Sequence, residues 1–181
     1  MGLDMYLYRI TNIKNYKYDG DSFEVNISYN GKKLKLENPS TIKEEVGYWR
    51  KANHIHNWFV ENTQDGEDEC MPSEVSREQL MQLLNLCREV KDKAIMVDGE
   101  MHTGIIHDRN GTRQMTEKGK LIENAEEIAE LLPTQQGFFF GSTDYDQYYM
   151  DAVDETIEIL ENALSNENEG IRQYFEYRAS W

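Results

Sequence analysis

The sequence predicts an α+β protein in which an antiparallel sheet packs against about three main helices. Both ends of the chain alternate apolar and polar residues as strands do, and three internal segments carry apolar residues at helical spacing. An Asn-Gly dipeptide between two alternating runs adds the strongest short signal for a β-hairpin. The chain has 181 residues, 39% of them hydrophobic, which suits one domain over 1–181 with a sizeable core.

The first and last segments of the chain, 3–10 and 171–181, are predicted as strands because apolar and polar side chains alternate along them. We expect them to lie in the same antiparallel sheet as a hairpin over residues 22–36. Its turn is Asn30-Gly31, two residue types that tolerate the positive φ angles of a type I′ turn. The second arm of this hairpin is basic because it carries three lysines, Lys32, Lys33 and Lys35.

The three main helices are predicted at 41–62, 77–92 and 143–164, where apolar residues recur three and four positions apart. In the first of them, Gly47 could mark a break or a late start. The first two segments begin at capping boxes, in which Ser or Thr precedes Glu or Gln by three residues. These boxes are Thr41 with Glu44 and Ser76 with Gln79.

The pattern weakens between the second and third helices, where an Asn-Gly dipeptide predicts a second hairpin or a long excursion over 98–119. Further on, three phenylalanines at 138–140 stand between two glycines, which predicts a short buried strand or a tightly packed extended segment. Ser142 and Thr143 follow as natural N-caps of the third helix.

His54 and His56 are the first candidates for catalysis or metal binding. Two histidines spaced by two can share a metal ion on a strand, but on a helix they lie about 200° apart. Because the surrounding pattern is helical, we favour packing or surface roles for both. Asp144 and Asp146 are the second candidates, as paired carboxylates for acid–base chemistry. For them we favour complementation of the charge at the start of the third helix.

The sequence lacks the motifs that usually mark a metal or cofactor site. The chain has no phosphate-binding glycine loop, no nucleophile elbow and no zinc-protease motif. Cys70 and Cys87 are too few for a disulfide framework or a zinc site, so we expect two reduced thiols. We therefore expect no metal and no cofactor, and we favour a protein without independent catalytic activity.

The net charge of −15 is unevenly distributed, because residues 123–181 alone carry a net −12. Such a field repels free nucleic acid and attracts basic surfaces. The simpler interpretation is a solvated acidic face, and the alternative is an acidic array that docks into a basic cleft of a partner. No segment is apolar enough to cross a bilayer and no signal peptide precedes the first strand, so we expect a cytoplasmic protein without a membrane partner.

Four blocks of the sequence stand out together. They are MGLDMYLYR at the start, EVGYWRKANHIHNWFVEN at 45–62, LLPTQQGFFFGSTDYDQYYMD at 131–151, and the terminal Ser180-Trp181. These blocks, which cover under half of the chain, resemble a family of small proteins encoded by phages and prophages of Gram-positive bacteria. The resemblance brings no established catalytic residues. Some accessory proteins of this size, charge and origin resemble anti-CRISPR proteins, which disable Cas9 by blocking guide RNA loading or by leading to a shortened guide RNA.

Three functions from different classes are compatible with these observations. The resemblance and the divided charge favour a phage-encoded inhibitor of host defence, an anti-CRISPR protein that acts on Cas9 or its guide RNA complex. Its partner would be a host defence protein with a basic surface, contacted by the hairpin lysines Lys32, Lys33 and Lys35. The first alternative is a small phage nuclease or nucleotide hydrolase that uses His54 or His56 with Asp144 or Asp146. The second is a protein that sequesters a small ligand in the tyrosine-rich region.

Overall fold

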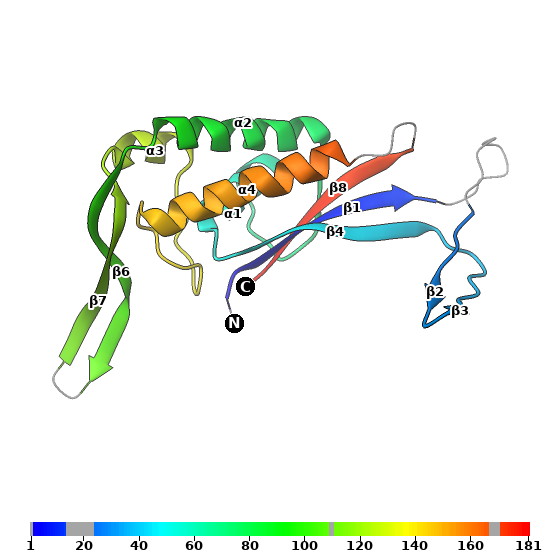
Figure 1. Ribbon diagram of the computed structural model, residues 1–181, viewed down its shortest axis with the longest axis horizontal. Coiled ribbons are helices and arrows are strands. Elements are labelled where there is room, and N and C mark those ends of the chain that lie inside the picture. Colours follow the sequence, from blue (N-terminus) through cyan, green and yellow to red (C-terminus); the bar gives the residue numbers. More distant parts are fainter. Residues whose placement is uncertain (1, 14–23, 109–110, 167–170) are drawn as a thin grey trace.

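The computed structural model describes residues 2–13, 24–108, 111–166 and 171–181, and it confirms the predicted α+β class. A four-stranded antiparallel sheet lies at its centre, with the strand order β4-β1-β8-β5 (Figure 1). The four strands are β1 (Asp4–Asn12), β4 (Thr41–Arg50), β5 (Ser73–Val75) and β8 (Gln173–Ser180). The N-terminal and C-terminal strands are therefore neighbours, as predicted.

Strand β1 lies inside the sheet and pairs along nearly all of its length with β4 on one side and β8 on the other. Met5 of β1 stands opposite Trp49 and Ala179, and Leu7 stands opposite Tyr177. Directly paired residues of antiparallel strands point to the same side of a sheet. All five of these side chains are fully buried, so this side of the sheet forms one wall of the core.

The helices of the described chain are α1 (Asn53–Thr63), α2 (Arg77–Lys93), α3 (Ala125–Leu131) and α4 (Gln147–Ser165). Helices α2 and α4 lie side by side (Figure 1), joined by the ion pairs Arg88–Glu161 at 2.6 Å and Lys91–Asp154 at 2.7 Å. Helix α2 begins at the predicted capping box of Ser76 and Gln79. None of the helices in the described ranges combines the length and the apolar composition needed to cross a membrane.

Helix α4 packs closely against β4. The Nε1–H group of Trp49 donates a buried hydrogen bond of 2.9 Å to Oγ1 of Thr156. A side chain at Gly47 would bring its Cβ within 2.5 Å of Ile159, so the glycine lets the helix approach the sheet. This close packing sets the distance between the acidic face of α4 and the end of β4, where the candidate functional site described below lies.

The prediction of one helix over 41–62 is wrong for its first half. That half forms β4, and the helix begins only at Asn53. The apolar spacing was misleading because Trp49 is buried from a strand while the later members of the pattern are buried from a helix. Thr41 and Glu44 are likewise strand residues rather than a cap, because pairing with β1 outweighs the local helix signals.

Two hairpins project from opposite ends of the molecule as separate two-stranded sheets (Figure 1). The predicted hairpin is formed by β2 (Ser28–Tyr29) and β3 (Lys32–Lys33), with positive φ at Asn30 (48°) and Gly31 (74°). We call residues 24–36 the basic arm; residues 22–23 of the predicted hairpin lie outside the described chain. The prediction that this hairpin joins the main sheet is wrong, because its short strands expose every side chain and offer no apolar face to pack.

The second hairpin confirms one of the two interpretations of residues 98–119. Strands β6 (Met96–Asp108) and β7 (Gly111–Ile122) pair in antiparallel fashion and form what we call the long arm. Its base enters the core through Met101 and Ile122, which are buried. The long arm is thereby fixed beside the start of α4.

The prediction of a buried segment at 138–140 is wrong for two of its three phenylalanines. Only Phe140 is buried, whereas Phe138 is 82% exposed and Phe139 is 51% exposed. Positive φ angles at Phe139 (67°) and Gly141 (96°) turn the backbone here, so the segment is a loop and not a strand. Two aromatic rings therefore project into solvent next to a buried one.

Candidate functional site

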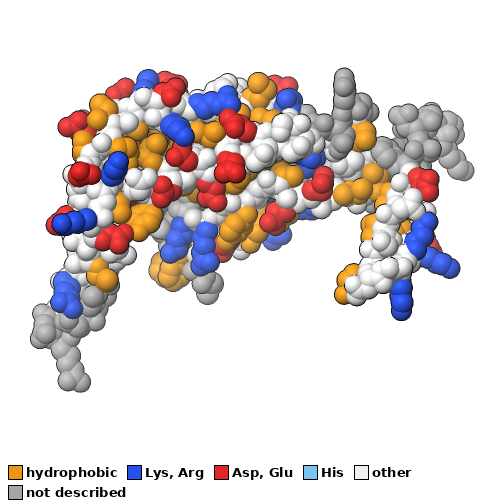
Figure 2. Space-filling model, viewed as in Figure 1, with side chains coloured by type: hydrophobic (Ala, Val, Ile, Leu, Met, Phe, Trp, Pro, Cys, Tyr) orange, Lys and Arg blue, Asp and Glu red, His pale blue; other side chains and the backbone are white. Residues whose placement is uncertain are grey.

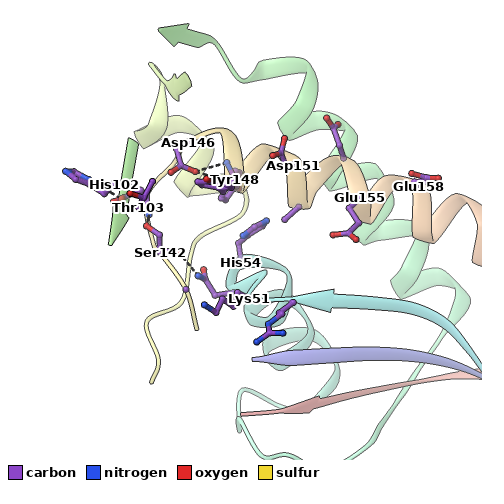
Figure 3. A pocket seen from close by; sticks show the side chains of 17 residues that line it. Lys51, His54, His102, Thr103, Ser142, Asp146, Tyr148, Asp151, Glu155 and Glu158 are labelled. Carbon is purple, nitrogen blue, oxygen red and sulfur yellow. Dashed lines mark hydrogen bonds and ion pairs between the residues drawn. The ribbon is translucent and has the colours of Figure 1, made fainter. Parts of the chain in front are cut away.

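A cleft of about 760 Å³ lies between α4, the end of β4, the start of α1 and the long arm (Figure 3). Arg50 and Lys51 line it on the β4 side, and His54 lines it from α1. Six carboxylates line it from α4 and from the loop before α4: Asp144, Asp146, Asp151, Asp154, Glu155 and Glu158. We call it the acidic cleft, and it brings together three of the four catalytic candidates, His54, Asp144 and Asp146.

Asp146 is the N-cap of α4, which begins later than the predicted caps Ser142 and Thr143 would place it. Its Oδ1 atom accepts hydrogen bonds from the backbone N–H groups of Tyr148 (2.9 Å) and Tyr149 (3.2 Å). Its Oδ2 atom is buried and has no hydrogen-bond partner among the described residues, and the whole residue is 1% exposed. Burial raises the pKa of this carboxyl, while the two backbone hydrogen bonds oppose the shift.

His54 rises from α1 toward α4 (Figure 3) and is only 3% exposed. Its ring lies 4.1 Å from the ring of Tyr149, centroid to centroid. Burial lowers its pKa to about 3, so the imidazole is neutral at pH 7. Its buried Nε2 atom has no hydrogen-bond partner within the described chain. His54 therefore combines a neutral ring with an unused polar atom at the wall of the acidic cleft.

His56 points elsewhere, as the helical spacing predicts. Its Nδ1 atom lies 2.7 Å from the hydroxyl of Tyr177 and its Nε2 atom lies 3.1 Å from Oδ2 of Asp68. Nε1–H of Trp181 donates to the other oxygen of Asp68 at 3.1 Å. Burial lowers the pKa of His56, and the nearby Asp68 carboxylate opposes this shift. His56 fastens the C-terminal segment to α1 and does not line the acidic cleft.

The four candidates therefore do not form one catalytic centre. No hydrogen bond joins His54 to Asp144 or Asp146 in the described structure, and a base with a pKa near 3 takes up protons poorly at neutral pH. Within the described ranges, no three His, Cys, Asp or Glu side chains converge closely enough to hold a metal ion. The residues that line the cleft offer charge and unused hydrogen-bonding capacity.

Two side-chain contacts attach the long arm to the mouth of the cleft. Nδ1 of His102 lies 3.3 Å from Oδ2 of Asp144, and the hydroxyl of Tyr148 donates to Oε1 of Glu117 at 2.6 Å. Sequence reasoning did not single out His102 or Lys51 as site residues. No local signal marks them, because they reach the cleft from separate segments of the chain.

Asn53 holds the loop that leads into α4. Its Nδ2 group donates to the carbonyl oxygens of Phe140 (3.3 Å) and Ser142 (2.7 Å), and its Oδ1 accepts from the backbone N–H of Gln135 (3.2 Å). Asn53 is itself buried, so one side chain satisfies three backbone groups of the loop. The loop is thus fixed in a shape that keeps the rings of Phe138 and Phe139 in contact, 4.1 Å apart between centroids.

The predicted contact lysines Lys32, Lys33 and Lys35 are all exposed on the basic arm. Figure 2 shows lysine side chains extending from that arm into solvent, away from the body of the molecule. They lie at the opposite end of the molecule from the start of α4, so they take no part in the acidic cleft (Figure 1).

Comparisons with protein-family models, with curated proteins and with solved structures found no match to this chain.

Proposed function

We propose that this protein is an inhibitor that binds a host defence protein through that protein's basic surface, without catalytic activity of its own. The observation that carries the proposal is the separation of charge over an extended molecule. An acidic cleft lies along α4 (Figure 3). The basic arm, with its three exposed lysines, projects from one end of the molecule, away from the start of α4 (Figures 1 and 2). Two surfaces of opposite sign suit a partner that also presents both signs.

Nucleic-acid-handling proteins present such a combination when their nucleic acid is bound. Their grooves are basic because they neutralise phosphates, and parts of the bound strand remain exposed and negative. The acidic cleft would meet the basic groove, and the lysines of the basic arm would meet phosphate or an acidic protein surface. Opposite charges at both ends would also fix the orientation of the complex.

The resemblance of four sequence blocks to phage proteins supports Cas9, or its complex with guide RNA, as this partner. In this proposal, contact with Cas9 blocks guide RNA loading or leads to shortening of the guide RNA. The host cytoplasm is where the two proteins would meet.

The arrangement gives less support to the hydrolase alternative. A nuclease or nucleotide hydrolase needs a base, a nucleophile or a metal ion at one point. His54 has its pKa lowered to about 3, and His56 is turned to Tyr177 and Asp68 instead of the cleft. Sequestration of a small ligand is a second candidate, favoured by the volume of the cleft and by Tyr148 and Tyr149 in its wall.

The proposal is tested by DNA cleavage with purified Cas9 and guide RNA in the presence of increasing amounts of this protein. We expect inhibition at near-stoichiometric amounts. The variant Lys33→Glu with Lys35→Glu should still fold, because both side chains are exposed, and should need about tenfold more protein for the same inhibition.

The matched control is Lys118→Glu with Lys120→Glu, which reverses two exposed lysines at the same spacing on the long arm. We expect it to inhibit like the parent. Equal inhibition by both double variants and the parent would remove the basic arm from the interface. A parent protein that never inhibits Cas9 or alters its guide RNA would remove Cas9 as the partner.

A further inference from the structure

We infer that the acidic cleft and the exposed pair Phe138 and Phe139 form one contact surface for a basic peptide segment of the partner, with an arginine side chain inserted against α4. This inference rests on the proposed partner-binding function and specifies the chemistry that the partner presents. The two features are continuous. A second hollow, lined partly by Phe138, shares Gly141 and Ser142 with the acidic cleft.

The charge of the cleft favours a cation on the α4 side. Six carboxylates face two permanently positive side chains, Arg50 and Lys51. Some of the carboxylates already have partners: Lys91 pairs with Asp154, and His102 lies beside Asp144. Glu155 and Glu158 make neither an ion pair nor a hydrogen bond within the described chain, so they remain available to an incoming guanidinium group.

The buried wall supplies a second, independent observation. Asp146 and His54 are almost fully buried, and each holds one polar atom, Oδ2 and Nε2 respectively, without a hydrogen-bond partner in the described structure. Leaving a buried acceptor unpaired costs free energy, because water no longer solvates it. A guanidinium group has five N–H donors, and the nitrogen that a neutral imidazole leaves unprotonated accepts a hydrogen bond. The chemistry of these two atoms therefore suits an arginine side chain, which would have to displace the groups that cover both atoms in this structure.

The β4 side of the cleft selects a peptide over a free polyamine. Arg50 and Lys51 line this side, where they would repel a molecule that carries only positive charge, whereas their N–H groups could donate hydrogen bonds to the carbonyl oxygens of a peptide backbone. A peptide that places an arginine against α4 and its backbone against Lys51 supplies a positive charge to the carboxylates and hydrogen-bond acceptors to the lysine.

The aromatic pair adds the apolar anchor that protein contacts commonly use. Phe138 and Phe139 are exposed and touch each other, and both stand on a loop that Asn53 fastens at three backbone groups. Phe139 keeps a positive φ of 67°, a conformation that bulky residues seldom adopt without a structural reason. Such rings stack on guanidinium groups and apolar side chains, and a fixed loop avoids the entropy loss of ordering it on binding.

The test is isothermal titration calorimetry of the full chain with a tetra-arginine peptide blocked at both ends, in the absence of Cas9. We expect binding that weakens as salt is raised. Glu155→Gln with Glu158→Gln should weaken it about tenfold, as removal of two partly exposed ion pairs does. The matched control, Glu126→Gln with Glu130→Gln, removes the same charge from exposed positions on α3 outside the cleft and should bind like the parent.

Two further variants test the buried wall and the aromatic pair. Asp146→Asn keeps an acceptor for the N-cap but replaces the unpaired oxygen, and Phe138→Ser removes an exposed ring; both should weaken binding several-fold. Equal weakening by the α3 control, or a tetra-glutamate peptide that binds as tightly, overturns the inference. If spermidine binds as tightly as the peptide, and Phe138→Ser binds the peptide as tightly as the parent does, the idea that the ligand is a peptide segment is overturned. Inhibition of Cas9 without peptide binding overturns this inference alone, and peptide binding without inhibition overturns only the choice of Cas9.

Discussion

Burial acts on His54 and Asp146 in opposite directions and moves both toward the neutral form. It lowers the pKa of the histidine to about 3 and raises the pKa of the aspartate. Neither residue has a charged partner that fully compensates for the loss of water, although two backbone N–H groups support Asp146. The wall of the acidic cleft thus contains hydrogen-bonding groups that are set by the fold and held ready for a donor.

His54 should make the stability of the protein depend on pH. Its pKa is about 3 in the folded protein and about 6.5 in the unfolded chain, so the unfolded chain binds the proton more readily. The stabilisation is fully present above pH 6.5 and is lost as pH falls toward 3. We expect a loss of about 1.4 kcal/mol for each pH unit below 6.5 from this residue.

Urea unfolding at several pH values between 7 and 4.5 measures this dependence. His54→Gln should flatten the pH profile of the unfolding free energy relative to the parent. His56, whose pKa burial also lowers, keeps part of the dependence in that variant. Parallel profiles for parent and variant would show that His54 is accessible to protons in the folded state.

Asn53 should matter for the loop that presents the aromatic pair. Asn53→Ala leaves three backbone groups of that loop without their side-chain partner, and we expect a cost of about 1–3 kcal/mol. Asn57→Ala is the control on the same helix, because its only described side-chain hydrogen bond is an exposed contact of 3.5 Å to Pro133. If the two variants lower the thermal midpoint by the same amount, Asn53 does not have the role described here.

At the level of elements, the sequence predicted a helix or strand correctly where the signals for it lie within that one segment. Helix α2 combines a capping box with an apolar stripe on one face, and both features are read within one segment. Strand β4 was missed because its state depends on pairing with β1, which lies about thirty residues away along the chain. The exposure of Phe138 was missed for a similar reason, because Asn53 determines the shape of that loop from a distant segment.

The candidate site could likewise be predicted only in part from local sequence signals. His54, Asp144 and Asp146 were singled out by residue type, and the fold places them around one cleft. Arg50 and His102 complete that cleft from a strand end and from the long arm, and nothing in their immediate neighbours in the sequence marks them. Long-range pairing, and not local pattern, brings these side chains together.

Helix α4 should be essential to the fold because it covers β4 and pairs with α2. Leu160 lies on its buried face, as the helical spacing predicted, and is fully buried in the core. Leu160→Ala should cost about 2–5 kcal/mol through lost apolar burial and the cavity left behind. Asn162→Ala, at an exposed position of the same helix, should cost far less; an unchanged denaturation midpoint for Leu160→Ala would contradict the packing described here.

The molecule as a whole should fold without a metal ion. No cluster of suitable ligands occurs within the described ranges, and the apolar core is continuous from the sheet to the helices. Excess EDTA should leave the thermal midpoint unchanged to within about 1 °C, because a structural metal would stabilise the fold strongly. A large drop of the thermal midpoint in EDTA, reversed by one divalent ion, would contradict this and would make the histidines candidate metal ligands.

The central claim is that two separate charged surfaces bind one partner, and a double-mutant cycle tests it most directly. The measurement is the dissociation constant for the Cas9–guide RNA complex of four proteins: the parent, Lys33→Glu with Lys35→Glu, Glu155→Gln with Glu158→Gln, and all four changes together. Because no residue of the basic arm lines the acidic cleft, the effects of the two double variants should multiply, from about tenfold each to about hundredfold combined. A parent that does not bind, or double variants that bind as tightly as the parent, would contradict the claim.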